Sequence, residues 1–274
     1  MTILSEDIRV IDTFLRTVPN KSLIVTMPDP ILILSTITEY IIYRTKMIPI
    51  AYVDVKSIQP MMYSESGIAV HPFALYFSPE TPLIVLKSPY RLSKEFIAKT
   101  YPEVVRALVE WSDRNEFERI LFLDVMPSQD ESKIFFITEV GEAKRLHEMG
   151  FKPYDGFFTT RAAYFLDECM KSRVTGILLV VTSCILGKAL QQFRLIEAGK
   201  RDPSIIQDFI NIASTFDKKA AINILKAVSK ITGYEIPLDK FEERVNKVQK
   251  VMRSFAESTL REFEEKAKMT FGPI

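Results

Sequence analysis

The chain is short of the residues on which most catalytic and cofactor sites depend. Its 274 residues include nine glycines, two cysteines, two histidines and one tryptophan. It has no Walker loop, no Gly-x-Gly-x-x-Gly after a predicted strand and no Gly-x-Ser-x-Gly nucleophile elbow. These absences count against a P-loop nucleotide site, a dinucleotide site and a serine hydrolase. The residues alone indicate no catalytic centre, and we expect no cofactor.

Histidine and cysteine are too scattered to indicate a metal site. His71 and His147 lie far apart, and neither has a second ligand at helical spacing, whereas a zinc site normally needs several side-chain ligands. We therefore expect no metal. Cys169 falls in a predicted helix and Cys184 in a strand-like run. Two free, buried thiols are expected, because free cysteine behaves as a small hydrophobe and nothing indicates an oxidising compartment.

An excess of charge of one sign is missing as well. The chain carries 36 Lys and Arg against 35 Asp and Glu, a net charge of +1. This balance argues against nucleic acid or a membrane as the main partner, because both require clustered basic residues. The most apolar run, Ile177 to Leu186, is much shorter than the about 20 residues that span a bilayer. Charges at Glu6, Asp7 and Arg9 interrupt any signal peptide, so we expect a cytoplasmic protein.

The chain does have an alternation of strand and helix patterns over most of its length. Hydrophobic residues make up 47% of it, enough for a sizeable core. The patterns predict strands at 23–25, 49–53, 74–77, 82–86, 119–125, 133–137 and 175–181. They predict helices at 8–18, 31–45, 101–115, 141–149, 160–171, 186–195 and 204–214, and a turn-rich stretch at 60–72. This alternation predicts an α/β fold, a sheet flanked by helices, with a C-terminal helical extension.

A capped helix is predicted after residue 216. Asp217 stands where an N-cap residue belongs, and apolar residues follow it at helical spacing, at Ala221, Ile224, Leu225 and Val228. Gly233 suits the C′ position, because glycine takes the left-handed conformation there without steric cost. Pro237 forbids a simple continuation and suits the first turn of the next helix.

The last segment, Leu238 to Lys268, predicts one long amphipathic helix of about 45 Å. Its apolar residues alternate at spacings of four and three, as in a coiled-coil seam. The seam consists of Phe241, Val245, Val248, Met252 and Phe255. Two interpretations stay open: the helix lies across its own domain, or it packs partly against another subunit. We accordingly predict an α/β domain over residues 1–236 and a long helix with a tail over residues 237–274.

Two carboxylates and a histidine support a rival, enzymatic interpretation. Asp124 lies at the C-terminal end of a predicted strand, Asp54 follows another, and His71 stands in the turn-rich stretch. Paired carboxylates at strand ends can do acid–base work, although such residues more often cap loops. This interpretation predicts an enzyme on a nucleoside-phosphorylase-like scaffold with these residues joined in one pocket. The turn after the first strand, Met27 to Leu32, is a poor phosphate site, because its prolines lack donors and Asp29 would repel an anion.

The stretch from Asp217-Lys-Lys-Ala-Ala to Gly233-Tyr-Glu-Ile-Pro-Leu-Asp239 looks like the Asp-x-x-Ala-Ala…Leu…Leu…Gly-x-x-Ile-Asp pattern of one family. Upstream, Pro153-Tyr-Asp-Gly156 and Gly176-Ile-Leu-Leu179 occupy that family's order. In these features the chain resembles the PAC2 family, the archaeal homologues of proteasome assembly chaperones. The resemblance runs from residue 20 to residue 255 or so.

The resemblance implies an α/β scaffold similar to those of phosphorylases and hydrolases, and a non-catalytic activity as a chaperone or scaffold. It implies an archaeal, cytoplasmic protein whose partners are a second copy, a paralogous PAC2-like subunit or proteasome α subunits. Some family members dock into the proteasome with a hydrophobic-Tyr-any tail. This chain ends Phe271-Gly272-Pro273-Ile274, so docking by that route is not expected. We expect the seam and Phe271 to make the partner contacts.

Overall fold

The protein is described by a computed structural model, which covers residues 18–26, 29, 31–53, 63–65, 67–88, 94–156, 158, 160–200 and 202–271. For residues 63–65, 68, 94–99, 160, 255, 259 and 262–271 it describes the backbone alone. The predicted N-terminal helix at 8–18 therefore lies outside the described residues except for Val18.

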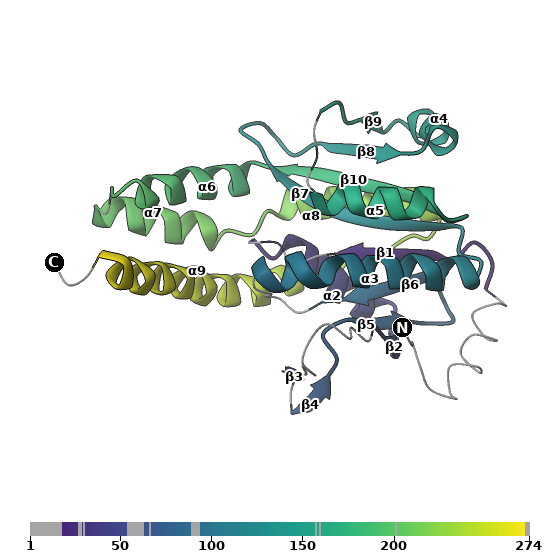
Figure 1. Ribbon diagram of the computed structural model, residues 1–274, viewed down its shortest axis with the longest axis horizontal. Coiled ribbons are helices and arrows are strands. Elements are labelled where there is room, and N and C mark those ends of the chain that lie inside the picture. The colour runs from purple at the N-terminus through teal and green to yellow at the C-terminus, as the bar shows by residue number, and fades with distance from the viewer. Residues whose placement is uncertain are drawn as a thin grey trace.

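An eight-stranded mixed sheet organises the molecule, in the order β2-β5-β6-β1-β7-β10-β8-β9 (Figure 1). The four central strands run parallel: β6 (Leu83–Lys87), β1 (Ser22–Thr26), β7 (Arg119–Pro127) and β10 (Thr175–Ser183). The remaining strands are β2 (Ile48–Tyr52), β5 (Ala74–Phe77), β8 (Ile134–Thr138) and β9 (Lys152–Pro153). The central strands consist of almost unbroken apolar runs, because helices cover both of their faces. The predicted α/β class is confirmed.

Alternation along each strand divides the core into two layers. On β1, Ile24 points to one face while Leu23 and Val25 point to the other, and all three are buried. The first face is covered by α2 (Ile33–Arg44), α8 (Lys218–Thr232) and the first half of α9 (Phe241–Phe271). The second face is covered by α3 (Lys94–Arg114) and α5 (Thr160–Met170). The remaining helices are α4 (Val140–Glu148), α6 (Cys184–Glu197) and α7 (Pro203–Ala213).

The predicted caps of α8 are confirmed. Asp217 accepts a hydrogen bond from the backbone N–H of Ala220 at 3.0 Å, and Gly233 ends the helix with a φ of 69°. The Asp217 carboxylate also accepts from the Ser183 hydroxyl at 2.6 Å, and that hydroxyl caps α6 by accepting from the N–H of Leu186. One buried pair of side chains therefore holds the starts of two helices together.

Several predicted boundaries need correction. The stretch 60–72 contains a small hairpin, β3 (Tyr63–Glu65) and β4 (Ile68–Val70), whose strands are too short for a pattern. Helix α3 begins at Lys94, so Pro102 lies inside it rather than near its start, and Cys184 opens α6 rather than continuing a strand. Pro237 precedes α9 by four residues instead of occupying its first turn.

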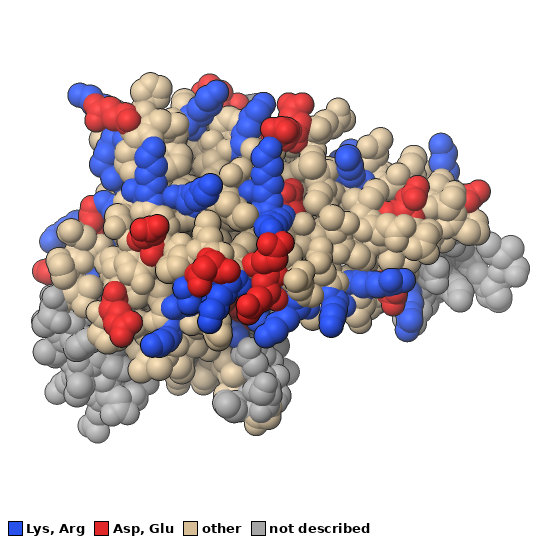
Figure 2. Space-filling view, turned by 180° about the vertical axis from the view of Figure 1, so that it is seen from behind, with Lys and Arg blue, Asp and Glu red and all other residues tan. Residues whose placement is uncertain are grey.

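Helix α6 makes a close backbone contact with the body of the fold. A Cβ atom at Gly187 would lie 2.2 Å from the carbonyl oxygen of Ser128, in the loop after β7. Only glycine allows this approach, which fixes where α6 leaves the sheet. Helices α6 and α7 and the second half of α9 then project beyond the sheet as a three-helix lobe (Figure 1). Over the face in Figure 2, basic and acidic side chains are intermixed, in keeping with the balanced composition.

Candidate functional site

The turn after β1 carries a buried carboxylate where many α/β proteins bind an anion. Asp29 accepts hydrogen bonds from the backbone N–H groups of Ile31, Ile33 and Leu34 at 3.1, 3.0 and 2.7 Å. Burial raises the pKa of Asp29 to about 6, against the lowering effect of those three bonds. Because the first turn of α2 already donates to the chain's own carboxylate, this turn is a poor phosphate site, as the sequence predicts.

The residues of the enzymatic interpretation are not brought together. Asp124 lies half-buried on β7, where burial raises its pKa and the charge of Arg161 opposes the rise. His71 stacks on Tyr52 of the edge strand β2, with 3.6 Å between ring centroids. Three strands separate β2 from β7, so these two strands lie about 19 Å apart at the usual spacing. Asp54 lies outside the described residues.

The predicted partner seam lies in the chain's own core along the first half of α9. The exposed fractions of Phe241, Val245, Val248 and Met252 are 1%, 5%, 6% and 2%. Phe241 packs edge-on against Tyr40, with 4.9 Å between centroids. As the chain is folded, these four side chains are not available to a partner, and this half of the helix lies across its own domain. The side chains of Phe255 and Phe271 lie outside the described residues, and their partner role stays a prediction.

Polar contacts fasten the start of α9 to α2. The Tyr40 hydroxyl donates to the carbonyl oxygen of Pro237 at 2.5 Å, and Arg44 forms an ion pair with Asp239 at 2.7 Å. Each contact joins residues almost 200 positions apart in the sequence. No local pattern contains such a pairing, so sequence reasoning missed it.

A largely buried ion cluster adds a second attachment. The Glu39 carboxylate of α2 lies between Lys87, at the end of β6, and Arg244, on α9. The Lys87 amino group is 3.6 Å away, and Arg244 forms the closer pair. Burial lowers the pKa of Arg244. Removing one member would leave a buried charge without its partner, which is strongly destabilising. The cluster therefore holds α9 in place even if its net contribution to the free energy of unfolding is small.

The lobe has a small core of its own. Its fully buried members are Ile196, Phe209, Ala256 and Leu260, from α6, α7 and α9. Partly buried apolar residues surround them, at Phe193, Ile205, Ile206, Ile210 and Ala213. On another side of α9, Val251 is 53% exposed. The sequence predicts each of these helices, but no pattern predicted that they would form a separate core.

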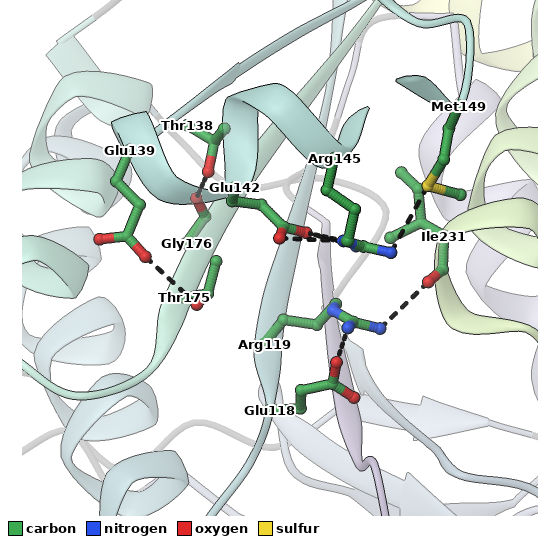
Figure 3. A network of polar contacts seen from close by, with 10 residues as sticks. All are labelled: Glu118, Arg119, Thr138, Glu139, Glu142, Arg145, Met149, Thr175, Gly176 and Ile231. Carbon is green, nitrogen blue, oxygen red and sulfur yellow. Dashed lines mark hydrogen bonds and ion pairs between the residues drawn. The ribbon is translucent and has the colours of Figure 1, made fainter. Parts of the chain in front are cut away.

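A polar network ties α8 and α4 to the amino ends of the strands (Figure 3). Arg119, at the start of β7, donates to the carbonyl oxygen of Ile231 at 3.0 Å and pairs with Glu118. On α4, the Nε–H group of Arg145 donates to both carboxylate oxygens of Glu142, at 2.8 and 2.9 Å. Burial, together with the charge of Arg145, lowers the pKa of Arg119. Since both guanidinium groups have partners within the chain, the network is structural.

The remaining candidate chemistry gives no site. Cys169 and Cys184 are free, the first buried and the second half-buried. Burial raises the pKa of the Cys169 thiol far above its usual range, which opposes nucleophilic use. In the described parts of the chain no three His, Cys, Asp or Glu side chains gather as metal ligands. Within those same parts, no helix combines the length and apolar character needed to cross a membrane.

Comparison with known proteins gives a family match and several similar folds. A sequence model described as the PAC2 family matches residues 23–256. A structure of a Thermoplasma acidophilum protein of unknown function is similar with a TM-score of 0.69 and 18% identity, covering 98% of this chain and 100% of that one. No curated protein matches the sequence.

Two structures from Pyrococcus furiosus are also similar. PbaA, described as an archaeal homolog of proteasome-assembly chaperone, has a TM-score of 0.65 and 17% identity, covering 88% of this chain and 93% of that one. PbaB, described as an archaeal proteasome activator, has a TM-score of 0.59 and 15% identity, covering 87% and 94%. At these identities the likeness shows the fold.

Proposed function

The chain belongs to the PAC2 family, and we propose that it acts as a non-catalytic, oligomeric scaffold or chaperone for protein assembly. One observation carries the proposal: the family match extends from β1 into the first half of α9, so it includes both layers of the core. The similar Pyrococcus furiosus structures, described as a chaperone homolog and a proteasome activator, support the same role.

Two features of the strand ends support a role without catalysis. The Asp29 carboxylate occupies the donors of the α2 N-terminus that a phosphate would need. Asp124 lies on β7, whereas His71, in the loop between β4 and β5, stacks on Tyr52 of the edge strand β2, with three strands between β2 and β7. Neither arrangement resembles an acid–base pair working on one substrate.

The partners in this proposal are proteins. They are a second copy of the chain, a paralogous PAC2-like subunit, or proteasome α subunits, met in the cytoplasm of an archaeal cell. Because the seam residues in the first half of α9 are buried in the chain's own core, we place the partner contacts on the outer surface of α9 and on the rest of the lobe. Phe255 and Phe271 remain among the proposed contact residues.

Native mass measurement of the purified chain tests this proposal. The mass is measured alone and after mixing with archaeal proteasome α subunits, with an unrelated protein of equal size replacing the α subunits as the control. We expect a discrete oligomer whose mass shifts with α subunits and not with the control. A chain that stays monomeric would overturn the proposed role, if it also binds neither the α subunits nor any paralogue co-purified from the native cells.

A further inference from the structure

A small hairpin stands apart from the rest of the fold. Its strands β3 and β4 pair only with each other, as a separate two-stranded sheet, and they project beyond the β2 side of the main sheet (Figure 1). Neither the exposed Ala69 nor the half-buried Val70 belongs to any of the three described hydrophobic clusters. An isolated two-stranded hairpin is only marginally stable in water. We therefore expect a further surface to cover this arm, which comprises residues 63–65 and 67–70.

The pairing register gives the arm one mainly apolar face. Residues that lie opposite each other in the two strands share a face, and so do residues two apart along a strand. Three apolar positions and one acidic position are brought together in this way: Tyr63, Ile68, Val70 and Glu65. Glu65 is the only charged residue between positions 63 and 70. The arm therefore combines apolar residues with a single negative charge.

The neighbouring edge of the main sheet has the complementary features. Ile48 on β2 is 63% exposed, and Tyr52 on the same strand is exposed as well. Lys46, in the turn before β2, is exposed and forms no ion pair within the described residues. It is the only charged residue between positions 45 and 52. This edge, which is β2 with the turn before it, therefore combines apolar surface with a single positive charge.

An added strand is a poor occupant of the β2 edge. Pro49 has no N–H group to donate, and the ladder with β5 shifts its register between Pro49 and Ala51. Prolines and bulges protect natural sheet edges from strand addition. They leave the exposed side chains of β2 uncovered, however, so the occupant that suits this edge is an element that packs its side chains over it.

We propose that two copies of this chain associate by exchanging arms, the arm of each copy packing over the β2 edge of the other. The arm and the edge lie on the same side of the sheet (Figure 1), so one two-fold axis brings both contacts into a single isologous interface. Three strand residues span about 10 Å, which is about two strand spacings and long enough to reach across β2.

Charge selects the arm of a second copy for this edge. In the exchanged pair Glu65 of one copy lies against Lys46 of the other, and the symmetry makes this opposition occur twice. Contact between the two arms would instead set Glu65 against Glu65. This inference rests on the proposed function, because it names the surface through which the oligomer forms, and it leaves the lobe to the other proposed partners.

The apolar part of the contact is tested on the full-length chain by Ile48→Ser. The substitution occurs twice in a two-fold pair and removes exposed apolar area, so the dissociation constant of the dimer should rise at least about tenfold. Met170→Ser is the matched control, because Met170 is also 63% exposed and ends α5, which packs on β10. It should leave the constant unchanged. Sedimentation over a range of concentrations measures both variants, and their thermal midpoints check the fold.

The charged part is tested by Lys46→Glu, by Glu65→Lys and by the two changes combined. Each single change sets like charges opposite each other and should raise the dissociation constant by about fivefold. The combined variant restores the opposition with its signs exchanged and should return the constant to near its original value. High salt should reduce these differences, because Lys46 is exposed to solvent.

Three outcomes would overturn arm exchange: an original chain that stays monomeric, an Ile48→Ser variant that associates as tightly as the original, or a combined charge variant that fails to recover. The proposed function is judged separately, by adding proteasome α subunits to the same samples. Association with α subunits by a chain that does not exchange arms would remove this inference and keep the proposed function. Arm exchange without any response to α subunits would keep this inference and remove α subunits from the proposed partners.

Discussion

The α/β body, which is the sheet with the helices that cover its two faces, differs from the three-helix lobe in how completely its apolar side chains are buried. In the body, strands β1, β6, β7 and β10 are covered on both faces, and most of their apolar side chains are fully buried. In the lobe, α7 contributes one buried side chain, Phe209, although much of its sequence is apolar. Its isoleucines are only partly covered. The body therefore buries its apolar side chains within the chain, whereas the lobe leaves part of its apolar surface exposed.

The sharpest test of this difference is at Phe241, where α9 belongs to the body. Phe241→Ala removes a ring packed against Tyr40 and Phe216 and should lower the free energy of unfolding by about 3–5 kcal/mol. Val251→Ala, on the exposed side of the same helix, should change it by less than about 0.5 kcal/mol. Urea unfolding measures both. Equal effects at the two positions would mean that the first half of α9 is not part of the body.

The pH dependence of stability tests the buried carboxylate of the body. The pKa of Asp29 is raised from 3.8 to about 6 in the folded chain, so between these values the folded chain binds the proton more tightly than the unfolded chain. The contribution of Asp29 to the free energy of unfolding should therefore fall as the pH rises from about 4 to 6, by about 3 kcal/mol at most.

The measurement for Asp29 is the difference in urea stability between the original chain and Asp29→Asn over pH 4 to 7. The asparagine does not titrate, so the difference isolates this group from other carboxylates. A difference that does not vary with pH would contradict the assigned burial of Asp29 as the dominant cause of its raised pKa.

The junction between body and lobe is tested at Gly187. Gly187→Ala places a methyl group against the backbone of Ser128 and should destabilise the chain by about 1–3 kcal/mol through overpacking. Gly141→Ala, in helix α4 with no neighbouring atom within 4 Å, is the matched control. It should be neutral or stabilise by up to about 1 kcal/mol, because alanine favours a helix. If both variants behave alike, the lobe does not leave the sheet at this contact.

Hydrogen exchange compares the local stability of the lobe and the body directly, without a substitution, and the expected difference is the smallest of these tests. Amides of α7 should exchange through local opening at a lower free energy than amides of β10, which require global unfolding. If the lobe pairs with a second copy, slower exchange in α9 and α7 should appear at high protein concentration and leave β10 unchanged. Equal protection of α7 and β10 in the dilute protein would show that the lobe and body unfold as one unit.

Local features of the sequence were predicted where one residue carries the physical reason. Asp217 and Gly233 end α8 because a carboxylate can accept the free N–H groups and glycine tolerates a positive φ. The long apolar runs gave the central strands. The hairpin β3–β4 was missed because three-residue strands carry no usable period. The sequence pattern places the start of α3 too late, because a proline is typical of a first helical turn and Pro102 lies inside the helix.

The sequence by itself determined the α/β class, the caps of α8, the length of α9 and the family, because each depends on residue types at short spacings. Only the tertiary structure decided what covers the apolar side of α9. An apolar stripe is equally suited to the chain's own sheet or to another subunit, and the choice depends on contacts such as Tyr40 with Pro237 and Glu39 with Arg244. The residues of each pair are about 200 positions apart in the sequence. They can form these contacts only after the fold has brought α2 next to α9.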